Sequence, residues 1–338
     1  MQKNHCFFLI LTFFLFSRCS KEVVHTDELE NHSCFLKYSE KVENEDVIFN
    51  GSCPLSISTV FPEKYTYSYP VFNPNNSNEI AYQRRDTELQ HGWNDELWVF
   101  NFCTGESRFL TDKIGYSPDW SVKDWIVFTG KDRQLWKIKS TGDSLLQLTN
   151  AGGFNNHPSW NSEGDKIAYR HSSSTLGNHF LLADELGKTI DTISNFLVRS
   201  WDWEFENISF VKEINNEDVL QYYNLKTGEF KILDVAPIMG TSDSMLLNTI
   251  ILKGHKAVLW NQMKQIGYTK ILNGKRVILK KGADNRLYMN ISISNSNQEV
   301  LAERVDIERI SICKKEERRN LFLINVDSKE ERKIDLPE

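Results

Sequence analysis

Residues 158–169 read PSWNSEGDKIAY, and this stretch decides the fold. Trp160 stands before a turn rich in Asn, Ser, Gly and Asp, and the apolar run Ile167-Ala168-Tyr169 follows that turn. Aromatic and β-branched segments bounded by such residues are typical of short strands. The stretch therefore predicts a tight β-hairpin.

The same pattern recurs along most of the chain. We take as anchors the aromatic or apolar residues that open each copy; they are separated by 48, 40, 41, 38 and 54 residues and are Phe72, Trp120, Trp160, Trp201, Met239 and Ile293. A second hairpin follows most anchors, with a glycine such as Gly142 supplying the positive φ of its turn. Each copy therefore predicts four short antiparallel strands.

A four-stranded repeat of this kind cannot bury both of its faces alone, so copies must pack against one another in an array or a ring. An open solenoid would carry polar capping repeats, and neither end of the repeat region has their character. Radially repeated four-stranded sheets form a propeller. The six anchors predict an all-β fold, a six-bladed β-propeller of four-stranded antiparallel blades.

The repeats resemble those of the TolB propeller family, whose pattern is Pro-x-Trp-Ser-Pro-Asp-Gly followed by an Ile-Ala-Phe strand. Residues 157–169 and the run Ser117-Pro118-Asp119-Trp120 carry the resemblance best, and it covers residues 66–336. It implies the propeller fold. The same blades occur in a periplasmic Tol–Pal component, in serine peptidases and in exported lipoproteins, so the resemblance implies no single function.

The N-terminus has the pattern of an export signal. A basic start precedes an apolar run from Phe7 to Phe16, which is too short to span a bilayer. Cys19 directly follows the run and resembles the acylated Cys of bacterial lipoproteins, although Arg18 stands where that family has a small residue. Lipidation at Cys19 is the interpretation we favour, and ordinary cleavage to a soluble exported protein is the alternative.

Three regions follow from this signal. We expect residues 1–19 to be a signal peptide with the lipoprotein-like Cys19, residues 20–54 to be a tether and N-terminal segment, and residues 55–338 to be the TolB-like propeller. The protein is then exported and faces the periplasm or the cell surface. The lipid would hold it to a membrane without inserting the chain.

The composition and the missing motifs argue against several classes of function. The net charge is −6, from 40 basic and 46 acidic residues, which disfavours nucleic acid as a partner. The chain has no Gly-x-Ser-x-Gly, Gly-x-Gly-x-x-Gly, His-Glu-x-x-His or Cys-x-x-Cys motif, so no hydrolase elbow, dinucleotide loop or standard zinc site is indicated. We therefore expect no catalytic residue, no metal site and no cofactor.

Four cysteines follow the export segment. In an exported protein they can form disulfides. We expect a Cys34–Cys53 bridge, because both residues lie in a short N-terminal segment that lacks a core of its own. Cys103 and Cys313 occupy non-equivalent repeat positions and are expected to be buried thiols.

A propeller needs a seal between its first and last blades, because an unpaired strand edge would otherwise open there. Residues Leu55 to Phe61 alternate like a strand and precede the first blade. We expect this stretch to lie beside the sixth blade.

The candidate binding residues are Trp93 and His91 in the loop 86–96, His157 before a channel-facing strand, and His171 in the polar loop 171–179. Exposed loop aromatics favour contacts with proteins or sugars.

Two function hypotheses follow. The first is a non-enzymatic, monomeric envelope lipoprotein that binds an envelope protein or glycan through these channel-mouth loops. The second is a propeller enzyme, a polysaccharide lyase or lactonase-like hydrolase that uses channel histidines and a divalent metal. The missing catalytic motifs favour the first.

Overall fold

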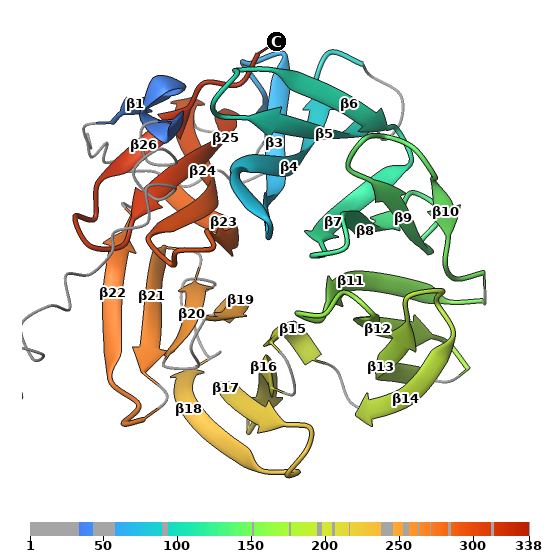
Figure 1. The fold of residues 1–338 in the computed structure, drawn as a ribbon. Coiled ribbons are helices and arrows are strands. Elements are labelled where there is room, and N and C mark those ends of the chain that lie inside the picture. The colour runs from blue at the N-terminus through green and yellow to red at the C-terminus, as the bar shows by residue number, and fades with distance from the viewer. Residues whose placement is uncertain are drawn as a thin grey trace, which may run out of the picture.

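The computed structural model is a closed ring of β-sheets (Figure 1). Its 26 strands form six sheets, accompanied in the described part by one helical turn at residues 34–37. The predicted all-β, six-bladed β-propeller of four-stranded antiparallel blades is confirmed. The structure describes residues 34–42 and 58–337, with gaps at residues 90–93, 151, 176, 195–197, 205–206, 216, 238–245, 253–256, 263, 271, 283–284 and 312–313.

Each blade is built from four consecutive strands. The strands are, in blade one, β3 (Tyr65–Asn73), β4 (Asn76–Asp86), β5 (Asp95–Asn101) and β6 (Ser107–Thr111); in blade two, β7 (Ile114–Trp120), β8 (Trp125–Gly130), β9 (Leu135–Lys139) and β10 (Leu146–Gln147); in blade three, β11 (Phe154–Trp160), β12 (Lys166–Ser173), β13 (Gly177–Asp184) and β14 (Thr189–Ser194); in blade four, β15 (Val198–Glu204), β16 (Asn207–Ile214), β17 (Glu217–Asn224) and β18 (Phe230–Pro237); in blade five, β19 (Leu246–Ile251), β20 (Ala257–Gln262), β21 (Gln265–Lys270) and β22 (Arg276–Lys281); in blade six, β23 (Arg286–Ile293), β24 (Glu299–Ser311), β25 (Lys314–Asn325) and β26 (Glu331–Ile334).

The first strand of every blade lies nearest to the central axis and the fourth lies at the outside (Figure 1). The second strands carry the most buried apolar runs; Ile80, Ile126, Ile167 and Ile208 are all 0% exposed. Neighbouring blades cover both faces of these strands, so the hydrophobic core is divided among the interfaces between blades.

The strand register corrects the sequence alignment of the repeats. Trp203, not Trp201, lies opposite Ile208, as Trp160 lies opposite Ile167. Blade four contains two tryptophans two residues apart, and alternate residues of a strand share a face, so the pattern alone could not separate them. In blade five the anchor is Ile251 on β19, whereas Met239 lies outside the described residues. The corrected separations are 48, 40, 43, 48 and 42 residues.

The expected Cys34–Cys53 disulfide is wrong. Cys34 is bonded to Cys103, so Cys103 is not a buried thiol either. The N-terminal segment packs against blade one instead of folding on itself, and this contact brings the two sulfurs together. Cys53 and Cys313 lie outside the described residues.

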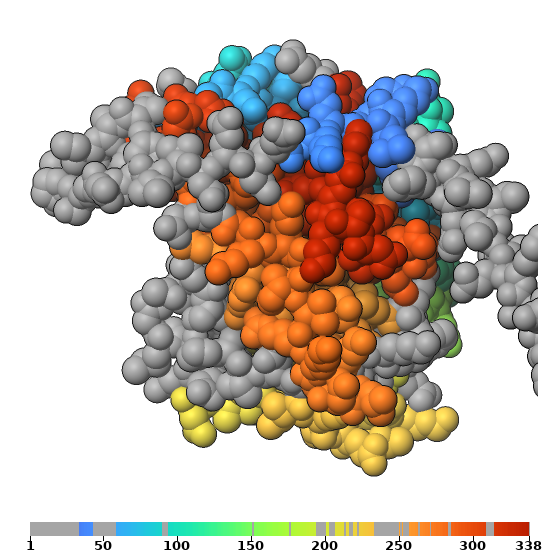
Figure 2. Space-filling model, turned by 90° about the vertical axis from the view of Figure 1, so that its left-hand side faces the viewer, coloured from blue at the N-terminus to red at the C-terminus, as the bar shows by residue number. Residues whose placement is uncertain are grey.

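The segment of residues 34–42, which we call the N-terminal clasp, joins the two ends of the ring. Its strand β1 (Ser39–Lys41) pairs antiparallel with β26, adding a strand to the outer edge of blade six. Phe35 packs against Phe102 and Phe72 of blade one, with ring centroids 4.9 Å and 6.1 Å away. Figure 2 shows this blue segment lying against the red C-terminal strands.

Hydrogen bonds secure the clasp on both sides of the seam. Towards blade one, the Lys37 Nζ donates to the Cys103 carbonyl at 3.1 Å and the Tyr38 hydroxyl donates to the Thr104 carbonyl at 3.0 Å. Towards blade six, the Arg332 guanidinium donates to the hydroxyl and the carbonyl of Ser39. The clasp is therefore tied to the first and last blades at once.

A second short strand, β2 (Ser58–Val60), pairs in parallel with the start of β25. The expectation that residues 55–61 lie beside blade six is confirmed for Ser58–Val60. The contact is with the projecting β24–β25 hairpin rather than with the outer strand β26, because β1 already occupies that edge.

Removing the Cys34–Cys103 disulfide should loosen the ring. The bond spans 69 residues, and a disulfide of that span typically contributes about 2–4 kcal/mol to the free energy of unfolding. We expect the double variant Cys34→Ser/Cys103→Ser to unfold at a lower temperature than the wild type in a calorimetric scan. Cys313→Ser is the matched control. Equal unfolding temperatures for the double variant and the wild type would contradict the role given to the clasp.

Candidate functional site

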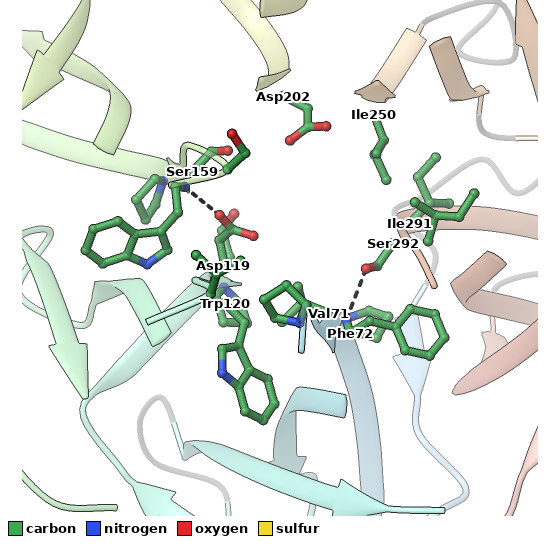
Figure 3. A pocket seen from close by; sticks show the side chains of 18 of the residues that line it. Val71, Phe72, Asp119, Trp120, Ser159, Asp202, Ile250, Ile291 and Ser292 are labelled. Carbon is green, nitrogen blue, oxygen red and sulfur yellow. Dashed lines mark hydrogen bonds between the residues drawn. The ribbon is translucent and has the colours of Figure 1, made fainter. Parts of the chain in front are cut away.

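A cavity of about 500 Å³ lies in the channel at the centre of the ring (Figure 3). Its walls come from all six blades, chiefly from the ends of the first strands and the turns that follow them. Small-molecule and peptide sites typically enclose about 300–1,000 Å³, so this cavity can admit a small molecule or a few side chains. We call it the channel pocket.

Each blade contributes the residue before its corrected anchor to the wall of the channel pocket. These register-equivalent positions, which we call the channel ring, are Val71, Asp119, Ser159, Asp202, Ile250 and Ser292. Figure 3 shows the two carboxylates directed into the space between the blades. The described residues that line the pocket include no Lys, Arg or His, so its fixed charge is negative.

Irregularities in the first strands turn several side chains of the channel ring towards the channel. Tyr69, Ser117 and His157 each precede a proline and have positive φ angles of 50°, 56° and 49°. The ladder shifts its register at each of these points. A bulge turns the following side chain in a new direction, and a non-glycine residue at positive φ costs about 1–3 kcal/mol. The fold thus accepts strain where side chains enter the channel.

Four rings from successive blades lie next to the channel pocket. Tyr69, Tyr116, His157 and Trp201 follow one another with centroid separations of 5.9, 5.3 and 6.2 Å. Trp201 and the neighbouring Ser117 also line the pocket. We call these four residues the aromatic belt. The faces of such rings attract cations.

Asp119 is the most perturbed acid of the site. Burial raises its pKa to about 7, opposed by hydrogen bonds from the backbone N–H groups of Trp160 and Trp120. The Trp160 bond, 2.6 Å long, crosses from blade three to blade two. Blade one likewise donates its Phe72 N–H to Ser292 of blade six at 3.1 Å (Figure 3). Channel-ring residues therefore join neighbouring blades as well as lining the pocket.

His157 lies in the aromatic belt, but it is not among the residues that line the channel pocket. Its Nδ1 lies 3.1 Å from the Ser117 Oγ. Burial, with a smaller effect of Arg170, lowers the pKa of His157 to about 4, so the imidazole is neutral at pH 7. Among the contacts of the described residues, no carboxylate orients this imidazole, so the pair lacks the third member of a hydrolytic triad.

The other predicted site residues do not join the channel pocket. His171 pairs with Asn155 at the opposite end of β11 from the pocket residues, and contacts His179. His91 and Trp93 lie outside the described residues. The prediction of a loop over residues 171–179 is wrong, because β12 continues to Ser173 and β13 begins at Gly177. This hairpin and the described ends of β4 and β5 belong to connections between second and third strands, so they lie on the opposite face of the ring from the turns that line the pocket.

Neither acid of the channel ring, Asp119 or Asp202, is among the binding residues predicted from the sequence. A usable signal was the residue between Pro and Trp in the repeat, occupied by Asp119 in one copy and Ser159 in the next. Asp202 precedes Trp203, the true anchor of blade four, and the repeat pattern alone points to Trp201 instead. In the described ranges, no three His, Cys, Asp or Glu side chains form a group suited to a metal ion. No helix of those ranges is long and apolar enough to cross a bilayer.

No family model matches the chain, and no curated protein sequence matches it. Several solved structures have a similar fold. A propeller described as putative TolB from Agrobacterium tumefaciens is 12% identical with a TM-score of 0.57, covering 70% of this chain and 87% of its own. TolB from Acinetobacter baumannii is 14% identical with a TM-score of 0.54, covering 80% and 79%.

An oligogalacturonate lyase from Vibrio parahaemolyticus has the same fold at 12% identity and a TM-score of 0.51, covering 79% of this chain and 77% of its own. TolB proteins and a lyase thus share this architecture with the chain, and at such identities the likeness establishes the fold alone. This chain is a TolB-like six-bladed β-propeller.

Proposed function

We propose that this protein is an exported, non-enzymatic binding propeller that holds a cationic group of an envelope partner in its channel pocket. One observation carries the proposal: Asp119 and Asp202 line a channel cavity to which the described residues contribute no cationic side chain. Acids gathered in an enclosed, low-dielectric cleft produce a field that attracts cations.

The other lining groups fit an ammonium or a guanidinium ion. Ser159 and Ser292 supply hydroxyl acceptors beside the acids, and the aromatic belt supplies ring faces. The pocket, about 500 Å³, cannot admit a folded domain but can admit a basic side chain or an amino terminus. A protein partner that projects a basic segment therefore fits better than an anionic glycan, which the carboxylates would repel.

Export is supported by two independent features. The first 19 residues have the pattern of a signal peptide, and Cys34 is bonded to Cys103. Disulfides persist in oxidising compartments outside the cytosol. We further propose that a lipid on Cys19 tethers the propeller to a membrane, so that the channel pocket meets partners in the periplasm or at the cell surface.

The enzyme hypothesis has weaker support. The channel histidines it needs are held by different partners, His157 by Ser117 and His171 by Asn155. A second oligogalacturonate lyase structure with a similar fold, 10% identical to this chain, is described as a complex with manganese. A stoichiometric divalent ion lost in His157→Ala would favour the enzyme over the binding propeller.

The role of the two acids of the channel pocket can be measured with short charged peptides. We expect a triarginine peptide to bind in calorimetry and a triglutamate peptide not to bind. Asp202→Asn should weaken triarginine binding about 10-fold, equivalent to about 1.4 kcal/mol. Asp143→Asn, in an exposed hairpin turn, is the matched control and should bind as the wild type does. Equal affinity in the wild type and Asp202→Asn would contradict the proposal that the channel pocket binds the cationic group.

We expect the affinity for the triarginine peptide to depend on pH. Because the pKa of Asp119 is about 7, the carboxylate forms as pH rises through neutrality, and triarginine should bind more tightly at pH 8 than at pH 6. The Asp119→Asn variant should lose most of this pH dependence. A wild-type affinity that fell between pH 6 and pH 8 would contradict the assignment.

Thermal unfolding provides a check of Asp119 without ligand. Its pKa in the folded state lies above the ordinary 3.8, so between pH 4 and pH 7 the folded protein binds more protons than the unfolded chain. The contribution of Asp119 to stability therefore decreases as pH rises through that window. Relative to the wild type, Asp119→Asn should gain stability from pH 4 to pH 7, and a constant difference in unfolding temperature across this range would contradict the raised pKa.

A further inference from the structure

A second cluster of side chains lies in blade three, outside the channel pocket. His171 of β12 and His179 of β13 are direct cross-strand partners. Their imidazole centroids are 6.4 Å apart and their planes are tilted by 35°. They lie near the tip of the β12–β13 hairpin, where that hairpin turns between Ser173 and Gly177.

This spacing is close to that of two imidazoles on one metal ion. Metal–nitrogen bonds of about 2.0–2.1 Å place two coordinating ring centroids about 5–6.4 Å apart, depending on the angle at the metal. The observed separation equals the linear limit of that range, so a tetrahedral ion would require the two imidazole centroids to approach each other by about 1 Å.

The proton positions on His171 follow from its surroundings. Asn155 is 2% exposed, and its amide nitrogen donates to the Gln134 Oε1 at 2.9 Å and to the Thr149 Oγ1 at 3.2 Å. The amide oxygen of Asn155 is thereby directed at the His171 Nδ1, 2.8 Å away. A carbonyl oxygen only accepts, so Nδ1 carries the proton and Nε2 of the neutral imidazole carries the lone pair.

This arrangement is the one that protein metal sites use. A metal-binding histidine usually donates its second N–H to a carbonyl or carboxylate, which fixes the tautomer and the ring orientation. Gly153 adds a further restraint, because a Cβ there would lie 2.7 Å from the His171 Cε1.

We infer that His171 and His179 form a two-histidine site for a late first-row divalent ion such as Cu²⁺, Ni²⁺ or Zn²⁺. Imidazole nitrogen suits these ions better than it suits Mg²⁺ or Ca²⁺, and Cu²⁺ should bind most tightly. The described ranges supply no third His, Cys, Asp or Glu to such a group, so water or an outside ligand completes the coordination. The site is separate from the channel pocket and does not depend on the proposed function.

Zn²⁺ titration of the purified full chain against a chromophoric chelator tests the site. We expect one ion to bind with a Kd on the order of micromolar, and His179→Gln to weaken it at least about 10-fold. Asn155→Leu, which keeps both imidazoles but removes the acceptor for Nδ1, should weaken binding by about 10–100-fold. Asp143→Asn, in the exposed hairpin turn of blade two, is the matched control and should bind as the wild type does.

Cu²⁺ paramagnetic resonance supplies a readout that a structural role would not change. The spectrum should show coupling to two imidazole nitrogens in the wild type and to one at most in His179→Gln. Unfolding temperatures measured without metal identify any variant that fails to fold, and His179, at the half-exposed hairpin, is the position that tolerates change best. Absence of binding to the wild type, or an unchanged affinity and spectrum in a folded His179→Gln, would overturn the site.

Discussion

The ring must close, because no blade can bury its own two faces. Blades one and six meet at a shared apolar cluster that contains Phe72, Leu301, Leu321 and Ile334, with Phe35 of the N-terminal clasp inserted among them. The described clusters between blades one and two, two and three, three and four, and five and six consist of blade residues alone, whereas this one also includes a segment that belongs to neither blade. Closure therefore depends on the clasp, and the disulfide and β1 pairing fix it to both sides.

A buried polar network lies on the other side of blade six, where that blade meets blade five. Glu331 of β26 is 2% exposed and is paired with Arg304 at 3.1 Å and with Lys280 of blade five at 3.2 Å, and it accepts from the Tyr288 hydroxyl at 3.0 Å. A buried charge that lost these partners would be strongly destabilising, so the network favours one packing of blades five and six. Along the axis, the Asp119–Trp160 and Ser292–Phe72 hydrogen bonds join neighbouring blades in a comparable way.

In the proposed function, the channel combines this structural role with recognition. The strained residues before each proline turn Val71, Asp119 and Ser159 towards the axis, and the same positions hold the blades together. A ligand that neutralised Asp119 would therefore act on a group that also bridges two blades. Binding in the channel and the stability of the ring are linked through that carboxylate.

The period of the sequence predicted the fold because turn residues and apolar runs alternate at lengths that only a radial array can pack. It could not predict the partner of Cys34, which is set by how the clasp lies on blade one. It misplaced the anchor of blade four, because Trp201 and Trp203 differ by one full strand period. That error also concealed Asp202, and the predicted His157 lies in the aromatic belt beside the channel pocket without lining it.

Hydrogen–deuterium exchange with and without the triarginine peptide tests the central claim most directly, namely that the acidic channel of a closed ring is the binding site. The account predicts slower exchange in the first strands, above all in β7, β11 and β15, with no change in the outer strands β10 and β14. Protection confined to the hairpin loops 86–96 and 171–179, with unchanged first strands, would contradict it.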